Sequence, residues 1–92
     1  MRDNAAHNQF EIGDGAATVF AIYRRTAEAL FIDHVEAPPA LRGTGAAGAL
    51  MEAIVAQARL EGREIVPVCG YAAAWLRRHG GASNAAIGGD KR

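Results

Sequence analysis

The sequence of 92 residues has little of what marks several classes of protein. A single cysteine, Cys69, rules out an internal disulfide, and with three scattered histidines it gives no close spacing of metal ligands. Ten basic residues balance ten acidic ones, so no net charge favours nucleic acid or an anionic membrane. No apolar run approaches the roughly 20 residues of a membrane span, and no signal-peptide run opens the chain. We therefore expect a cytoplasmic protein with no metal site and no nucleic-acid or membrane partner.

The length and composition indicate one small globular domain. Half of the residues are hydrophobic and 22% are charged, which is an ordinary balance for a folded chain. We expect this domain over residues 1–80 and a flexible tail over residues 81–92, where Gly, Ala, Ser and Asn occur without any period. Because so small a domain buries only roughly 60% of its unfolded surface, a monomer or a weak homodimer is expected.

Alternating, β-rich runs in the first forty residues predict an antiparallel meander of three strands. The runs cover residues 9–12, 18–23 and 30–36. Between the first two, Asp14-Gly15 predicts a tight hairpin turn. Pro38 and Pro39 end the third strand, because proline has no amide hydrogen to donate.

Two helices and one further strand complete the prediction. A helical apolar stripe begins near Gly45 and ends at Gly62; it comprises Ala47, Leu50, Met51, Ile54, Val55 and Ala58. Residues 65–68 predict a short strand buried on both faces and, because it follows a helix, parallel to an earlier strand. A second helix places Ala72, Trp75, Leu76 and His79 on one face and is closed by Gly80. The expected fold class is therefore α/β.

The most informative segment is the glycine-rich turn at residues 42–48, between the third strand and the first helix. Without Cβ atoms its backbone amides can approach an anion, and the helix N-terminus adds free N–H groups and a favourable dipole. Arg42 can add a charge-assisted contact. A tight packing turn that binds no ligand would carry the same glycines.

Two familiar phosphate motifs fit this turn poorly. A P-loop needs a lysine after its second glycine, but Lys91 is the only lysine in the chain. Gly43, Gly45 and Gly48 spell the G-x-G-x-x-G pattern of dinucleotide-binding folds. That pattern belongs after the first strand, whereas here three strand signals and two prolines precede it.

A third interpretation is a resemblance to a family. Arg42, Gly45 and Ala47 resemble the coenzyme A pyrophosphate loop of the GNAT N-acetyltransferase superfamily, which has Gln or Arg, two residues, Gly, one residue, then Gly or Ala. Residues 34–43 and 66–71 are similar to the His-Thr-Glu-Val-Pro-Pro and Val-Pro-Cys-Pro-aromatic runs of its miniature YjdJ-like branch, and residues 75–79 to its closing helix. The likeness covers residues 8–80 and departs from that branch at Val35, Ala37, Gly70 and Gly80.

The resemblance implies a small GNAT-like fold that binds acetyl-CoA. The backbone of Val35 and Ala37 would pair with the pantetheine arm, as an added strand does. The pyrophosphate would lie on Arg42, Gly43, Thr44, Gly45, Ala46 and Ala47. Cys69 and Arg78 would complete the coenzyme site, although Arg78 also suits the C-terminal end of a helix dipole.

The same resemblance implies transfer of an acetyl group to a primary amine, with a protein or peptide as a candidate acceptor. Glu36 and His34 alternate along one strand, so they face one side, and either could take the proton of the amine. A solvated pair without catalytic role has the same spacing. Cys69 could relay the acetyl group or only line the pocket, and Tyr71 could protonate the leaving thiolate. The alternative function is a non-catalytic module that binds or senses acyl-CoA.

Overall fold

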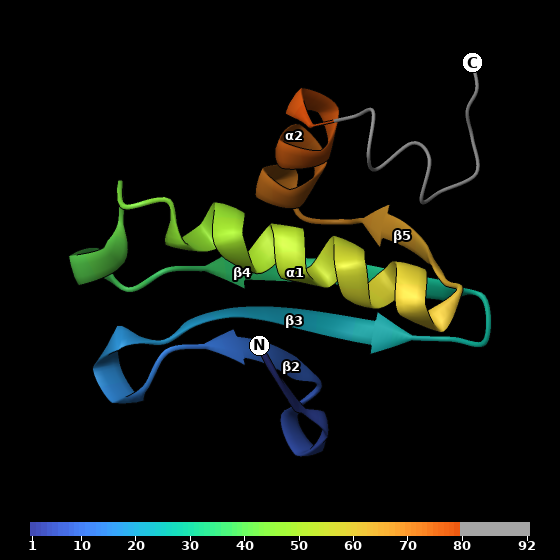
Figure 1. Cartoon of the computed structure of the whole chain (residues 1–92), viewed down its shortest axis with the longest axis horizontal. Coiled ribbons are helices and arrows are strands. Elements are labelled where there is room, and N and C mark those ends of the chain that lie inside the picture. Colours follow the sequence, from blue (N-terminus) through green and yellow to red (C-terminus); the bar gives the residue numbers. More distant parts are fainter. Residues whose placement is uncertain (80–92) are drawn as a thin grey trace.

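In the computed structural model, which describes residues 1–79, five strands form one mixed sheet in the order β1-β2-β3-β4-β5 (Figure 1). The elements are β1 (Arg2–Asn4), β2 (Gln9–Ile12), β3 (Val19–Arg25), β4 (Ala29–Glu36), α1 (Ala46–Glu61), β5 (Glu64–Pro67) and α2 (Gly70–Arg78), with short 3₁₀ turns η1 (Ala5–His7), η2 (Gly15–Ala17) and η3 (Pro39–Leu41). Strands β1 to β4 are antiparallel and β5 is parallel to β4. The predicted α/β class, with its meander, helix, parallel strand and second helix, is confirmed. The predictions for Gly80 and for a tail at 81–92 concern residues outside the described part of the chain.

Both helices pack against the same face of the sheet and share one core. The predicted stripe of α1 forms its centre: Leu50, Met51, Ile54, Val55 and Ala58 are buried, and Ala47 is half-buried against them. The sheet contributes Phe10, Val19, Ala21, Tyr23, Leu30, Ile32 and Ile65, and α2 contributes Ala72, Trp75 and Leu76. Each large apolar side chain buried in this way contributes about 1.5–3 kcal/mol to stability. None of the helices within residues 1–79 is long and apolar enough to cross a bilayer.

The connection between β2 and β3 differs from the predicted tight turn. Asp14 is extended, with φ −137°, and η2 follows it, so residues 13–18 all lie in the loop. Gly13 has φ +104°, and a Cβ there would lie 2.1 Å from the carbonyl oxygen of Ala17. The glycine is therefore required by a close approach of two backbone segments. The antiparallel hairpin is confirmed, but its connection is a longer loop than the tight turn predicted at Asp14-Gly15.

The two edge strands also depart from the sequence prediction. β1 has no alternating run and was not predicted; it is held by pairing with β2, for example Arg2 opposite Glu11. β5 is parallel to β4 as expected, but it is an edge strand and is not buried on both faces, since Val66 and Pro67 are half-buried and Val68 is 56% exposed. Proline is tolerated in a strand at an edge, where no neighbour needs its missing N–H.

An irregularity in β4 decides which side chains face which side of the sheet. Ile22 pairs with His34 whereas Tyr23 pairs with Ile32, so Asp33 is an extra residue, a β-bulge. In a regular strand Ile32, His34 and Glu36 would all point to one face. The bulge directs Ile32 toward the helices and both His34 and Glu36 toward the opposite face, which neither α1 nor α2 covers.

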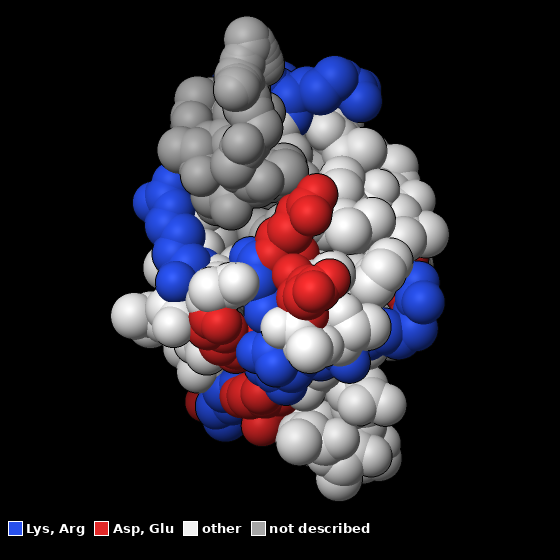
Figure 2. Space-filling view, turned by 90° about the vertical axis from the view of Figure 1, so that its right-hand side faces the viewer, with Lys and Arg blue, Asp and Glu red and all other residues white. Residues whose placement is uncertain are grey.

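The C-terminal end of α1 is tied to the sheet by a network of charges. Arg25 donates to both carboxylate oxygens of Glu61, at 2.9 and 2.8 Å, and to Asp3 at 3.2 Å. Arg63 pairs with the same Glu61 carboxylate, and the Tyr23 hydroxyl donates to Asp3. The hydrogen bond from Arg25 is the main cause that lowers the pKa of Glu61 to about 2. Figure 2 views this end of the molecule and shows basic and acidic side chains interleaved on it.

Candidate functional site

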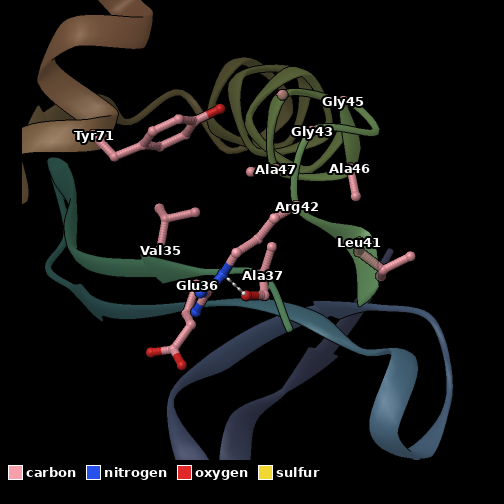
Figure 3. A pocket seen from close by; sticks show the side chains of 11 residues that line it. Val35, Glu36, Ala37, Leu41, Arg42, Gly43, Gly45, Ala46, Ala47 and Tyr71 are labelled. Carbon is pink, nitrogen blue, oxygen red and sulfur yellow. Dashed lines mark hydrogen bonds between the residues drawn. The ribbon is translucent and has the colours of Figure 1, made fainter. Parts of the chain in front are cut away.

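A cleft of about 640 Å³ opens where β4 ends, between the turn that leads into α1 and the first turn of α2 (Figure 3). Its lining comes from these three segments and consists of Val35, Glu36, Ala37, Leu41, Arg42, Gly43, Gly45, Ala46, Ala47, Gly48 and Tyr71. Small residues dominate the α1 side, so backbone rather than side-chain atoms form that wall.

The cleft lies where the two parallel strands separate. β5 pairs with β4 only from Ala29 to Ile32, and the N–H groups of Val68 and Cys69 both donate to the carbonyl of Ile32, at 2.9 and 3.1 Å. Beyond that point β4 continues to Glu36 and, within residues 1–79, has a neighbouring strand, β3, on one side only. The free edge of residues 33–36 can therefore accept an extended ligand that carries amide groups.

The glycine-rich turn, which lines the cleft, contains amides without hydrogen-bond acceptors in the described part of the chain. Gly43 and Gly45 have φ +80° and +87°, a left-handed backbone that glycine adopts without strain. Within residues 1–79, the N–H groups of Gly43, Gly45, Ala47 and Gly48 have no intramolecular acceptor. Four donors at the positive end of a 16-residue helix form an anion-binding arrangement.

Arg42 adds a positive charge beside these amides. Its Nε donates to the carbonyl of Ala37 at 3.2 Å, which holds the side chain along the end of β4 (Figure 3). No carboxylate in the described part of the chain forms an ion pair with it. The remaining N–H groups of the guanidinium are therefore available to an anionic ligand.

Two candidate residues lie at the start of α2. Figure 3 shows the ring of Tyr71 reaching from α2 toward the side of the cleft where Ala47 and Gly43 lie. Cys69 is the N-cap of α2: its Sγ accepts the N–H of Ala72 at 3.3 Å, and the residue is half-buried against the core. Cys69 thus lies next to the strand separation at Ile32 but is not among the lining residues.

His34 and Glu36 form a pair on the other side of β4. His34 Nε2 lies 2.8 Å from Oε1 of Glu36, and each side chain is about half exposed. In Figure 3 the Glu36 carboxylate points away from Tyr71, whereas Val35 points toward it. Glu36 lines the cleft at the end of β4, but its carboxylate faces the uncovered side of the sheet. The anion-binding turn and the His34–Glu36 pair therefore lie on opposite sides of the free β4 edge.

Most of the residues singled out in the sequence come together here. Those that line the cleft are Val35, Glu36, Ala37, Arg42, Gly43, Gly45, Ala46, Ala47 and Tyr71. His34, Thr44, Cys69 and Arg78 do not line it. The Thr44 hydroxyl is used inside the turn, where it donates to Leu41 and accepts from Ala46, and Arg78 is exposed in the last turn of α2. Two lining residues were missed, Leu41 and Gly48, although Gly48 is the third glycine of the turn.

The comparison with known families agrees with this geometry. The model of the GCN5-related N-acetyl-transferase family matches residues 9–84, most of the chain. The chain belongs to this family. No curated protein matches it. Membership confirms the resemblance to the GNAT superfamily, while the assignment to the YjdJ-like branch stays a prediction.

A GNAT domain of this shape has donor groups that suit acetyl-CoA. The free amides of residues 43–48 and the Arg42 guanidinium match a pyrophosphate, which needs several donors and positive charge. The unpaired edge of β4 matches an extended arm that carries amide groups. The residues present therefore fit the coenzyme that this family typically uses.

Proposed function

We propose that this GNAT domain is an acetyl-CoA-dependent N-acetyltransferase acting on a primary amine. The observation that carries the proposal is the set of four amides at the start of α1 that have no acceptor within residues 1–79 and that line the same cleft as the free end of β4. Every helix start leaves its first N–H groups without helical acceptors; here these amides share a cleft with Arg42 and with the free end of β4, a combination that suits an anionic ligand with an extended arm.

The coenzyme side of the site is built from backbone groups. We propose that residues 43–48 and Arg42 hold the pyrophosphate and that the β4 edge at Val35 and Ala37 pairs with the pantetheine arm. Acetyl-CoA, when bound, supplies a thioester carbonyl that an amine can attack. The free edge of β4 would orient the arm, and Tyr71 lines the same cleft.

The chain's own residues supply the proton transfers. Glu36, or His34 bonded to it, takes a proton from the acceptor amine, directly or through water. The amine nitrogen then forms a bond to the carbonyl carbon while the carbon–sulfur bond breaks. Tyr71 donates the proton that the departing thiolate needs, and Cys69 either packs against the core or relays the acetyl group. The products are an acetylated amine and free CoA.

Titration calorimetry with acetyl-CoA tests the coenzyme site. Gly45→Asp places a carboxylate among the four amides, so we expect micromolar binding by the unmodified protein and at least a hundredfold loss in the variant. Gly62→Asp is the matched control, because Gly62 has a similar φ of +68° with no atom within 4 Å of a Cβ, at the other end of the same helix. Equal losses in both variants would contradict the assignment of the turn.

Release of free CoA in the presence of amines tests turnover. We expect release to depend on the amine and to slow at least tenfold in Glu36→Gln while acetyl-CoA affinity is kept. Binding of acetyl-CoA without amine-dependent release would instead indicate the alternative, a non-catalytic acyl-CoA-binding module.

A further inference from the structure

The third glycine of the turn has a different reason from the first two. Gly43 and Gly45 have positive φ, and a Cβ on either would meet no atom within 4 Å. Gly48 lies within α1 and has no positive φ, but a Cβ there would lie 3.3 Å from Nε1 of Trp75. Glycine is unfavourable inside a helix, so the backbone does not explain its presence. The missing Cβ makes room for the indole nitrogen.

Trp75 brings a polar atom from α2 to the start of α1. Figure 1 shows α2 lying across the N-terminal half of α1, and Trp75 follows Tyr71, a lining residue of the cleft, by one helical turn. The residue is 6% exposed, and most of its ring packs in the core. Its Nε1 is the atom nearest to Gly48, which also lines the cleft. The indole N–H therefore lies beside the backbone donors of the glycine-rich turn.

This indole N–H has no hydrogen-bond partner within residues 1–79. A tryptophan nitrogen can only donate, and when buried it usually finds an acceptor. In the same part of the chain no side-chain nitrogen or oxygen is both fully buried and unbonded, so Nε1 reaches open space. A donor on an otherwise buried side chain, open beside the cleft, is available to a ligand that brings its own acceptor.

The orientation of the indole is fixed by its neighbours. The His79 ring stacks on it, with centroids 4.0 Å apart and planes inclined by 15°. His79 Nδ1 in turn lies 2.9 Å from the carbonyl oxygen of Trp75, which fastens the stacked ring to the same helix. A donor whose orientation is set before binding loses little conformational entropy when a ligand arrives. The packing of α2 therefore prepares this N–H for a contact.

We infer that Trp75 is a coenzyme-binding residue. Its Nε1–H donates to an oxygen of acetyl-CoA bound beside Gly48, either a pyrophosphate oxygen or a carbonyl oxygen of the pantetheine arm. Gly48 lacks a side chain so that the indole can reach this oxygen. The inference rests on the proposed function for the identity of the ligand. It makes α2 the third wall of the coenzyme site, with the glycine-rich turn and the free end of β4 as the other two.

The indole signal in a proton–nitrogen NMR spectrum tests the contact directly, because Trp75 is the only tryptophan in the chain. We expect saturating acetyl-CoA to move this signal downfield and to slow exchange of its proton with water at least about tenfold. A shift with inorganic pyrophosphate alone assigns the acceptor to the pyrophosphate, and a shift with pantetheine alone assigns it to the arm. An indole signal that acetyl-CoA leaves unchanged, while calorimetry shows binding, would overturn the inference.

Three variants test the named residues by calorimetry. Trp75→Phe removes the N–H but keeps an aromatic ring, so we expect about a tenfold weaker acetyl-CoA affinity. Gly48→Ala adds the Cβ that meets Nε1, and we expect affinity to fall at least about threefold. Leu76→Ala is the matched control: it removes core packing from α2 but no donor, so Tm should fall while affinity, measured well below Tm, stays within about twofold. Unchanged affinity in both Trp75→Phe and Gly48→Ala, or an equal loss in Leu76→Ala, overturns the inference.

The outcomes separate this inference from the proposed function. If acetyl-CoA does not bind the folded protein, the proposed function fails and the inference with it. If acetyl-CoA binds while the indole signal and the affinity of Trp75→Phe stay unchanged, only the inference fails. If acetyl-CoA binds and moves the indole signal but no amine is acetylated, the transferase is overturned and the role of Trp75 stands, because neither test needs turnover.

Discussion

The two ends of α1 differ in whether their polar groups have partners within the described chain. At the C-terminal end, Glu61 is bound by Arg25, Arg63 and Gln57. The N–H of Gly62 donates to carbonyl oxygens of the helix. At the N-terminal end, residues 43–48 keep four amides without intramolecular acceptors, and Arg42 has no acidic partner within residues 1–79. The ends are about 24 Å apart, from the rise per residue of a 16-residue helix.

This difference separates stability from binding along one helix. Groups that are satisfied inside the chain hold α1 on the sheet, and they gain nothing from a ligand. Groups left unpaired contribute little to the folded state but can contribute their full hydrogen bonds to an anion. Substitutions at one end should therefore change unfolding, and substitutions at the other end should change coenzyme binding.

The largest expected effect is on the free energy of unfolding, at the C-terminal end of α1. Arg25→Met removes the main partner of Glu61, whose side chain is mostly buried, and we expect a loss of about 2–3 kcal/mol, or roughly a 10–20 °C drop in Tm. Thermal unfolding followed by circular dichroism measures it. Acetyl-CoA affinity, measured well below Tm, should stay within twofold. A parallel loss of affinity would contradict the conclusion that one end of α1 serves stability and the other serves binding.

The second effect is a dependence of stability on pH. Arg25 holds the pKa of Glu61 at about 2, below its ordinary value of 4.5, so this carboxylate stabilises the fold above pH 4.5 and less as the pH falls toward 2. Between pH 6 and pH 3 we expect a loss of about 1–2 kcal/mol from this group. Denaturant unfolding at both pH values measures it. Glu61→Gln should be less stable at pH 6 and show a smaller change with pH; an identical change in both proteins would contradict the role of Glu61.

The smallest expected effect is on the free energy of acetyl-CoA binding, at the N-terminal end of α1. Arg42→Gln removes one charge-assisted contact to phosphate, for which we expect about a tenfold weaker acetyl-CoA affinity with Tm unchanged. Arg78→Gln is the comparison, since Arg78 was a sequence candidate but does not line the cleft. Calorimetry of both variants decides between them, and a larger loss in Arg78→Gln would move the phosphate site toward α2.

Much of the coenzyme side could be predicted from the sequence because it depends on local chemistry. Glycines at 43 and 45 predict a turn with positive φ, and both residues have positive φ in the structure. The spacing of apolar residues predicts the helix that follows this turn. Pro38 and Pro39 mark the end of β4 for the same kind of reason, since a missing donor is a property of the residue itself.

Other features escaped prediction because they depend on contacts between distant segments. β1 has no pattern of its own and exists by pairing with β2. The approach of Gly13 to Ala17 replaced the expected hairpin turn with a longer loop. The apolar run of β5 suggested burial on both faces, but the strand lies at the edge of the sheet and is partly exposed. A sequence does not record which strand will lack a neighbour.

The sequence by itself determined the α/β order, the apolar stripe of α1, the glycine turn and the presence of His34 and Glu36 on one strand face. Only the tertiary structure decided which face that is. The bulge at Asp33 is fixed by the pairing of β3 with β4, a long-range register that no local pattern encodes. That single extra residue turns the His34–Glu36 pair away from the helices, to the opposite side of β4 from the glycine turn.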